Sequence, residues 1–379
     1  MANIKAFRAI RQRTDDSSVE RDLQAWLEPG LNYGGDLKPY LLTFKRLLKD
    51  GFYLKEEGPA IYVYENHSSS GIQRGVWALT NVQDSTDGMI VLHEQTLPEH
   101  EDKIKAYREY IGLEGEPVLL TYYPQQEINN LMESVVSSQQ PERIVQAETA
   151  HLLWKVNEAS SIAAFQRSFA SLKNVYLADG HHRLAAAAHL KSDEQQWISS
   201  LYISTDQLRI REFNRLVIPA SIINKEELFE LIYRYFHVSA IPYNRAYQPD
   251  QQHRLGMCFH GEWYQLDLRP DLSALAQETD ALILQEYVLQ PFFGIADPRT
   301  DDRLHNFSPD GGWEKLLQEL RHQVSSIAFT LFPMTVEQLT RHAGKQKPLP
   351  PKSTWIEPKI PYGLLMYCSL QKEHNGITL

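Results

Sequence analysis

The sequence predicts a protein of the mixed α/β class, and three patterns point to that class. Between residues 126 and 220, strand-like runs alternate with helical runs, which is typical of a mixed sheet covered by helices. Before this region, residues 60–66 and 74–80 have the composition of two hairpin strands. After it, residues 225–236 follow the period of an amphipathic helix, and residues 255–268 form a second hairpin pattern.

The chain of 379 residues is long enough for roughly two or three domains. We expect an N-terminal α+β region over residues 1–125, a core over 126–220, and a C-terminal α+β region over 221–379 that carries a proline-rich loop. Apolar residues make up 42% of the chain and charged residues 23%, which is ordinary for a soluble globular protein.

The first region contains one helix, one hairpin and a second, charged helix. Residues 36–50 have helical periodicity that ends at Gly51. The strands of the hairpin are joined by a loop at Ser69, Ser70 and Gly71. Alternating acidic and basic residues over 99–110 predict an exposed helix.

The middle region predicts helices and strands in alternation. The predicted helices cover residues 126–137, 158–171 and 183–190, and the predicted strands cover 142–148, 151–156, 175–177, 199–204 and 213–219. We therefore expect one mixed sheet in this region.

The last region begins with the amphipathic helix, and a hairpin follows that turns near His260 and Gly261. Further helices are predicted over 277–289 and 313–325. Thr335 and Gln338 form a capping-box pattern that opens another short helix.

Charge and composition exclude several classes of protein. The net charge of −10 argues against binding of duplex nucleic acid through a basic face. The N-terminal residues lack the apolar stretch of a signal peptide, and no run is long enough to span a bilayer. Cys258 and Cys368 lie outside any metal or redox spacing. We expect a cytoplasmic protein with no membrane partner.

The most informative segment for chemistry is the joint between the strand 175–177 and the following helix, where Asp179, Gly180, His181, His182 and Arg183 are consecutive. The first-turn N–H groups of a helix have no intrahelical partner and carry partial positive charge. With an arginine and two imidazoles beside them, the joint suits an anion, most naturally a phosphate.

A purely structural interpretation of the joint is also open. Asp179 could be an N-cap, Gly180 a turn residue, and the histidines partly buried polar groups. However, four titratable or cationic side chains lie within five residues, and apolar sequence flanks them. Such clusters are costly in apolar surroundings unless they serve a site, so we favour a functional role.

A proline-rich segment near the C-terminus carries a second set of polar candidates. Its prolines prevent regular structure over most of residues 345–366. It is either a rigid surface strap or a cover for a site, and a stiff backbone lowers the entropy cost of ordering its side chains. Its candidate ligands for phosphate or carboxylate are Lys352, Ser353, Thr354 and Lys359.

Two motifs together resemble the signatures of the domain-of-unknown-function 1015 family: ADGHHR at 178–183 and PPKSTWIEPKIPYGL at 350–364. Other matching segments run in the expected order over essentially the whole chain. They are YVYE at 62–65, GMIVLHEQT at 88–96, HLLWKV at 151–156, ALILQEYVLQPFFGI at 281–295 and AFTLFP at 328–333.

That family is distantly similar to the ParB/sulfiredoxin group, which includes free-serine kinases with an Asp-Gly-x-x-Arg turn. The resemblance implies a ParB/sulfiredoxin-like core in which Gly180 lets a nucleotide phosphate approach the backbone and Arg183 holds it. It also implies that His181 or His182 contacts the phosphate, and that Asp179 acts as a base or as a ligand of Mg²⁺.

The sequence departs from the family pattern in four places. A Pro-Tyr-Asp segment is missing near the N-terminus, where residues 28–40 read EPGLNYGGDLKPY, and Asn214-Arg215 replaces the usual His-Arg. Two smaller departures are Leu349, where methionine usually precedes the two prolines, and Asp102-Lys103, where Asp-Arg is common. The missing Pro-Tyr-Asp segment and the replacement at Asn214-Arg215 are compatible with a family member that keeps its ligand pocket but has lost some of its catalytic residues.

The leading functional hypothesis is a kinase-like phosphotransferase that uses ATP or ADP and Mg²⁺ and acts on a small hydroxy compound. Phosphoryl transfer asks the protein mainly for positioning and charge neutralisation. Arg183 and Lys352 would hold the phosphate, and Glu94 or Asp179 would accept the hydroxyl proton. His93 is a candidate substrate contact. Trp154 is another, although with His151 it is more typical of a core edge.

Two alternatives remain. A metal-dependent hydrolase could use mixed nitrogen and oxygen ligands from Asp179, His181, His182 and His93, although adjacent histidines seldom reach one ion. A nucleotide-sensing switch or interaction protein would bind the ligand without turnover. The sequence contains no P-loop and no Gly-x-Gly-x-x-Gly fingerprint.

Overall fold

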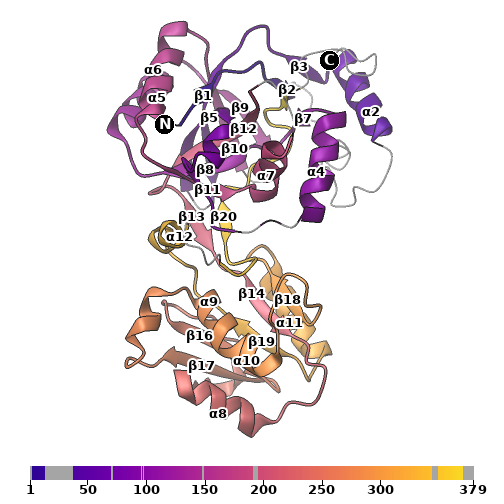
Figure 1. Ribbon diagram of the computed structural model, residues 1–379, viewed down its shortest axis with the longest axis vertical. Coiled ribbons are helices and arrows are strands. Elements are labelled where there is room, and N and C mark those ends of the chain that lie inside the picture. Colours follow the sequence, from indigo (N-terminus) through magenta and orange to yellow (C-terminus); the bar gives the residue numbers. More distant parts are fainter. Residues whose placement is uncertain are drawn as a thin grey trace. The chain divides into compact units, whose positions relative to one another are not determined.

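The computed structural model describes residues 2–12, 37–69, 71–94, 96, 98–146, 149–190, 195–343 and 349–369. The chain forms two compact units, which are drawn in Figure 1. The first unit combines Met1–Leu208 with Pro358–Leu379, and the second is Arg209–Glu357. Residues 28–36 of the N-terminal departure, Ser70 of the expected hairpin loop and residues 345–348 of the proline-rich segment lie outside the described residues.

The first unit is built on a mixed sheet of nine strands among the described residues. The strand order is β6-β11-β8-β12-β5-β4-β10-β9, and β1 also pairs with β5. The strands are β1 (Ile4–Lys5), β4 (Ile61–Ser68), β5 (Gly71–Asn81), β6 (Ile90–Val91), β8 (Val118–Tyr122), β9 (Glu142–Gln146), β10 (Thr149–Val156), β11 (Val175–Asp179) and β12 (Trp197–Ser204).

This sheet confirms the mixed α/β class, and it also crosses the expected boundary near residue 125. The predicted hairpin is present as β4 and β5, with Ser68 paired to Gly71 at its tip. The outer partner of β4 is β10, and the outer partner of β5 is β12. Because strands from residues 1–125 and 126–220 share one sheet, the two units differ from the three regions expected from the sequence.

Helices and two short strand pairs complete the first unit. The amphipathic helix α2 buries Leu41, Phe44 and Leu47, as its periodicity predicts. The helix expected to be exposed, α4, instead buries Tyr107 and Arg108. The helices are α2 (Lys38–Lys49), α3 (Gln83–Thr86), α4 (Pro98–Tyr110), α5 (Gln126–Ser138), α6 (Ala159–Ala170) and α7 (His181–Ala188). The pairs are β2 (Ile10–Gln12) with β3 (Tyr53–Lys55), and β7 (Leu113–Glu114) with β21 (Tyr367–Cys368).

The second unit is built on a six-stranded sheet with the order β15-β17-β16-β19-β14-β18 among the described residues. Its strands are β14 (Asn214–Val217), β15 (Phe236–Ala240), β16 (Arg254–Phe259), β17 (Glu262–Leu268), β18 (Leu304–Phe307) and β19 (Ile327–Thr330). The predicted hairpin is β16 and β17. His260 and Gly261 form its turn with φ values of 50° and 77°, which is the backbone a two-residue hairpin loop requires.

The helices of the second unit follow the predicted pattern with small shifts. The helix expected over 277–289 begins only at Asp280, and it continues through a π-helical turn. The capping box of Thr335 and Gln338 is present. The elements are α8 (Lys225–Tyr235), η1 (Pro242–Asn244), η2 (Ser273–Gln277), α9 (Asp280–Leu284), the π turn η3 (Gln285–Leu289), α10 (Gln290–Phe293), α11 (Gly312–His322) and α12 (Val336–His342), with the strand pair β13 (Arg209–Arg211) and β20 (Trp355–Glu357).

Both units bury apolar cores of their own. The first packs its sheet against α5 and α6 through residues such as Phe165 and Phe169, and α7 contributes Leu184. The second packs α8 and α9 on its sheet through Leu228, Ile283 and their neighbours. Within the described ranges, every helix is too short or too polar to cross a membrane.

Candidate functional site

The order of strands in the first unit explains how distant polar residues meet. Strands β6 and β11 are parallel, with Val175 opposite Ile90 and Tyr176 opposite Val91. The residues that follow each strand therefore leave the sheet at the same edge, which places His93 beside the joint after β11. Strand β8 is antiparallel to β11 and begins at this edge, so Glu116 lies there too.

Gly180 forms the turn between β11 and α7, and its backbone requires glycine. It is the N-cap of the eight-residue helix α7 and has a φ of 95°. A Cβ atom there would lie 2.9 Å from Val118 Cγ1 and 3.1 Å from two guanidinium nitrogens of Arg183. The backbone thus passes directly beneath the arginine head group, where a side chain would separate the two.

Asp179 and Lys359 form an ion pair at this turn. Lys359 Nζ lies 2.6 Å from Asp179 Oδ2, although the two residues are far apart in the sequence. Burial raises the pKa of Asp179, but the charges of Lys359 and Arg183 and the hydrogen bond from Lys359 outweigh it, so that the pKa is lowered to about 2. Asp179 is therefore a carboxylate at neutral pH and a weak proton acceptor. The other Asp179 oxygen accepts the Gly180 N–H at 2.7 Å.

Arg183 projects from the first turn of α7 and pairs with Glu116. The distance from Arg183 Nη1 to Glu116 Oε2 is 2.7 Å, and 24% of the arginine side chain is exposed. Sequence reasoning missed Glu116, because a lone glutamate before a strand carries no signal of its own. The exposed edge of the turn thus carries two cations, each paired with a carboxylate.

His93 and His181 meet directly behind the turn. Their ring centroids are 4.4 Å apart with the rings almost perpendicular. Only 3% of His93 and 7% of His181 is exposed. Among the described residues, no hydrogen bond of regular geometry reaches the Nε2 of His181, and the ring of His93 makes only an irregular contact with the backbone of Leu177. Burial lowers the pKa of His93 to about 4 and lowers the pKa of His181 well below its usual value. Both rings are therefore neutral at pH 7.

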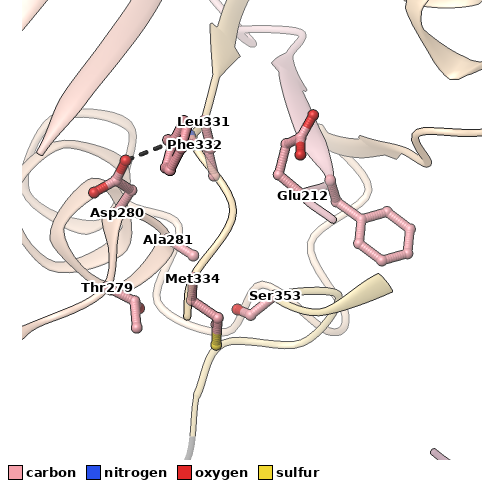
Figure 2. Close-up of a pocket in the computed structure, with 9 residues that line it drawn as sticks. Glu212, Thr279, Asp280, Ala281, Leu331, Phe332, Met334 and Ser353 are labelled. Carbon is pink, nitrogen blue, oxygen red and sulfur yellow. Dashed lines mark hydrogen bonds between the residues drawn. The ribbon is translucent and has the colours of Figure 1, made fainter. Parts of the chain in front are cut away.

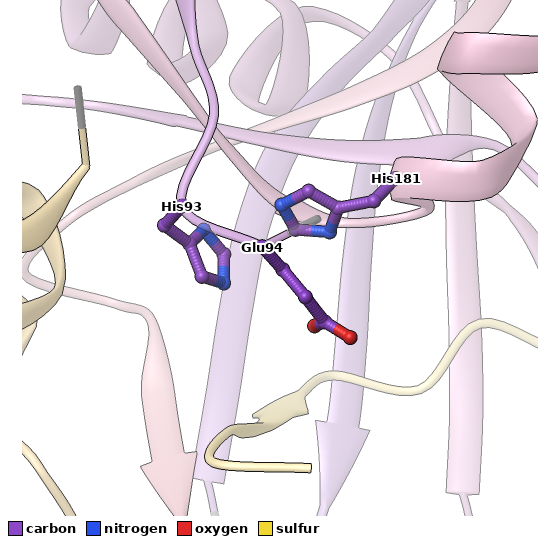
Figure 3. Close-up of side chains that lie close together, drawn as sticks. All are labelled: His93, Glu94 and His181. Atoms are coloured by element: carbon purple, nitrogen blue, oxygen red, sulfur yellow. The ribbon is translucent and has the colours of Figure 1, made fainter. Parts of the chain in front are cut away.

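Glu94 completes a group of three potential metal ligands. One ligand atom from each of His93, Glu94 and His181 lies within 4.8 Å of the other two. Figure 3 shows the two rings and the carboxylate converging from the segment after β6 and the start of α7. His182 lies outside this group, and its ring lies 5.3 Å from that of His100 on α4.

Trp154 does not reach this site. It is 3% exposed in the core of the first unit, and its indole N–H donates to the carbonyl of Gln139 at 3.2 Å. The predicted role in substrate binding is therefore not supported: the ring packs against the sheet core and leaves almost no surface for a ligand. The prediction of a core edge describes this position better.

Lys352, Ser353 and Thr354 belong to the second unit, where a buried arginine organises their loop. Arg215 is 3% exposed, and its guanidinium donates to the carbonyls of Pro351 at 3.2 Å and Lys352 at 2.7 Å. Lys352 adopts a left-handed φ of 55°, which is uncommon for a side chain of its size. The sequence marks Arg215 only as part of a departure from the family pattern, since its role as a loop clamp depends on contacts between distant residues.

A small pocket of the second unit contains the buried acid Asp280 (Figure 2). Its carboxylate accepts the backbone N–H of His253 at 2.9 Å and that of Phe332 at 3.4 Å. Burial raises the pKa of Asp280 to about 7, although these hydrogen bonds oppose the change. The pocket holds no cation among its lining residues, so the acid serves here as a backbone anchor.

The Asp280→Asn variant tests this anchor. A carboxyl whose pKa rises on folding contributes stability below its unfolded pKa of about 4, and that contribution is lost as the pH rises through about 7. The amide keeps an oxygen acceptor but carries no charge. We expect the variant to unfold at a higher temperature than wild type at pH 8, with no gain at pH 4. Equal unfolding temperatures of the wild-type and Asp280→Asn proteins at pH 8 would contradict a destabilising buried charge at Asp280. Asp271→Asn, at an exposed site, is the control.

Comparisons with known proteins place the chain in a broader context. A family model described as "Protein of unknown function (DUF1015)" matches residues 41–288, and the curated proteins gave no match. Among solved structures, the chain is similar to SbnI with a C-terminal truncation from Staphylococcus aureus, with 13% identity, 78% of this chain and 90% of that chain covered, and a TM-score of 0.43. It is also similar to a free serine kinase variant in complex with ADP, with 11% identity, 76% and 89% coverage, and a TM-score of 0.41.

A third similar structure is a conserved hypothetical protein from Pyrococcus furiosus, with 10% identity, 77% of this chain and 95% of that chain covered, and a TM-score of 0.39. The serine kinase belongs to the group that the motif resemblance named. Because all three TM-scores lie below 0.5, these likenesses do not transfer a binding site to this chain.

Proposed function

The chain belongs to the DUF1015 family of proteins of unknown function, and we propose that this member binds a nucleotide by its phosphates and transfers a phosphoryl group to a small hydroxy compound. The observation that carries the proposal is the turn after β11. A left-handed Gly180 opens α7 there, and two cations, Arg183 and Lys359, lie beside an ionised Asp179.

The turn offers phosphate three kinds of favourable contact. The first-turn amides of α7 point outward at the positive end of the helix dipole. Arg183 supplies a planar fork that suits phosphate oxygens, and Lys359 supplies a point charge. His182, half-buried in the first turn, is a further donor. Phosphate would compete with Glu116 for Arg183, and both side chains are partly exposed and able to rearrange.

Asp179 would hold Mg²⁺ rather than act as the base. Mg²⁺ prefers ionised oxygen ligands and bridges the phosphates of a bound nucleotide, where it neutralises charge. A pKa of about 2 suits that role and makes the carboxylate a poor proton acceptor. Glu94 is then the candidate acceptor. The terminal phosphorus–oxygen bond of the nucleotide breaks, a bond to the acceptor hydroxyl oxygen forms, and the hydroxyl proton passes to Glu94.

The Arg183→Ala variant tests the phosphate contact. Wild-type protein should melt several degrees higher with at least one of ATP, ADP, CTP or GTP in the presence of Mg²⁺. The variant should bind that nucleotide about 10–100-fold more weakly, the worth of a charge-assisted contact. Calorimetric titration measures the change. Arg167→Ala, at an exposed arginine of α6, is the matched control.

A second substitution separates a phosphate ligand from a structural ion pair. Glu116→Gln removes the competing partner of Arg183, so nucleotide should bind equally or more tightly. If Arg183 instead acts only through its pair with Glu116, both variants should weaken binding alike, and the proposal would be lost. A melting shift without any phosphorylated product would favour a nucleotide-sensing switch over a kinase.

A further inference from the structure

We propose that His93, Glu94 and His181 form a binding site for one divalent transition-metal ion of the Zn²⁺ type. The three side chains come from two segments that parallel strands bring to one edge of the sheet. The site needs neither a nucleotide nor the phosphoryl transfer proposed above, and it can be tested without them.

The poorly satisfied ring nitrogens of two buried histidines are the first argument. His93 and His181 are both more than nine-tenths buried. Buried polar atoms are almost always hydrogen-bonded, and leaving one unpaired costs about 1–3 kcal/mol. Here two adjacent imidazoles leave nitrogens without regular hydrogen bonds within the described residues. A metal ion would use lone pairs from both rings at once.

Geometry is the second argument. Two ligands that share a tetrahedral Zn²⁺ ion lie about 3–3.5 Å apart, given metal–ligand distances of about 2.0–2.2 Å. The three ligand atoms already lie within 4.8 Å of one another, so small side-chain rotations would bring them to an ion. Asp179 is engaged by Lys359 and stays outside the set. Three protein ligands leave a fourth position open, as in catalytic rather than structural zinc sites.

Ligand chemistry is the third argument, and it selects the class of metal. Neutral imidazole suits Zn²⁺, Co²⁺, Ni²⁺ and Fe²⁺, whereas Mg²⁺ prefers oxygen ligands and retains its waters. The two histidines therefore separate this site from the Mg²⁺ proposed at Asp179. Two different ions would bind on the two sides of the same turn.

One consequence does rest on the proposed function. A carboxylate that ligates a metal ion cannot also accept a proton, so a filled site would deprive phosphoryl transfer of Glu94. Zn²⁺ at saturating concentration should then inhibit the transfer. Glu94→Gln protein should show the same low rate with or without Zn²⁺.

Titration with Co²⁺ tests the site directly. Full-length protein without a histidine tag is stripped of metal and titrated with Co²⁺, followed by the visible absorption that low-symmetry, four- or five-coordinate cobalt gives. We expect saturation at one ion per chain, displacement by Zn²⁺, and no displacement by a large excess of Mg²⁺. Absence of stoichiometric binding to the wild-type protein overturns the proposal, whatever the nucleotide experiments give.

Single substitutions assign the ligands. His93→Gln, His181→Gln and Glu94→Gln should each weaken Co²⁺ binding by more than the about 10–100-fold typical of losing an outer-shell partner. His151→Gln is the matched control, because His151 is equally buried but bonds Tyr64 through Nδ1. Glu94 is half-buried, so its isosteric variant remains informative if a histidine variant fails to fold. Unchanged Co²⁺ affinity in folded Glu94→Gln protein would overturn this ligand set.

Discussion

Replacement of Gly180 by alanine is expected to reduce nucleotide affinity at least ~100-fold, the largest effect on binding of any substitution in the turn. An L-residue at a φ of 95° costs about 1–2 kcal/mol in backbone strain alone. The new methyl group would also lie 2.9 Å from Val118 Cγ1 and 3.1 Å from two guanidinium nitrogens of Arg183, so the arginine head group must shift away from the backbone that it covers. Titration calorimetry measures the affinity, and circular dichroism confirms that the variant is folded.

The chain supplies its own control for this experiment. Gly88 also follows an aspartate and has a positive φ of 73°, but a Cβ atom there meets no atom within 4 Å. Gly88→Ala should therefore carry a similar backbone strain without any loss of nucleotide binding. Equal losses in the two variants would mean that general destabilisation, and not the phosphate turn, explains the effect.

Replacement of Asp179 by asparagine is expected to lower the rate of phosphoryl transfer by about 10²–10⁴-fold. Loss of a charged metal ligand removes several kcal/mol of transition-state stabilisation. The fold should survive, because the amide oxygen can still accept the Gly180 N–H. Nucleotide should still bind, since Lys359 loses its carboxylate partner but remains available to phosphate.

The two kinetic parameters separate this role from a structural one. In Asp179→Asn protein kcat should fall, while KM for the nucleotide should change by less than about tenfold, because the phosphate contacts remain. Asp87→Asn, at another Asp-Gly pair of the first unit, should leave both unchanged. Full activity in Asp179→Asn protein would show that Asp179 has no role in catalysis. A loss of nucleotide binding together with a loss of helix content would show that Asp179 has a structural role instead.

Local patterns in the sequence predicted local structure well. The hairpin of β4 and β5, the turn at His260 and Gly261, and the capping box at Thr335 all depend on residues close in sequence. The strand, turn and helix around Gly180 were predicted for the same reason. Membership of the DUF1015 family, inferred from two motifs, is confirmed by the family match.

The other features of the fold and of the site could not be predicted, because they depend on pairing between residues far apart in the sequence. Strand β6 has only two residues, so its parallel pairing with β11, which brings His93 to His181, has no periodicity to predict it. Glu116 and the clamp at Arg215 become visible only once strands far apart in the chain are paired. The return of the chain to the first unit at Pro358 depends on the pairing of β21 with β7, and no composition change marks it.

The structure of the complex with ADP and Mg²⁺ is the most direct test of whether the turn after β11 holds the phosphates of a nucleotide. We predict phosphate oxygens within hydrogen-bond distance of Arg183, Lys359 and the first-turn amides of α7. We also predict that Glu116 releases the arginine. ADP bound elsewhere, with the pairs Arg183–Glu116 and Lys359–Asp179 both intact, would contradict a phosphate site at this turn.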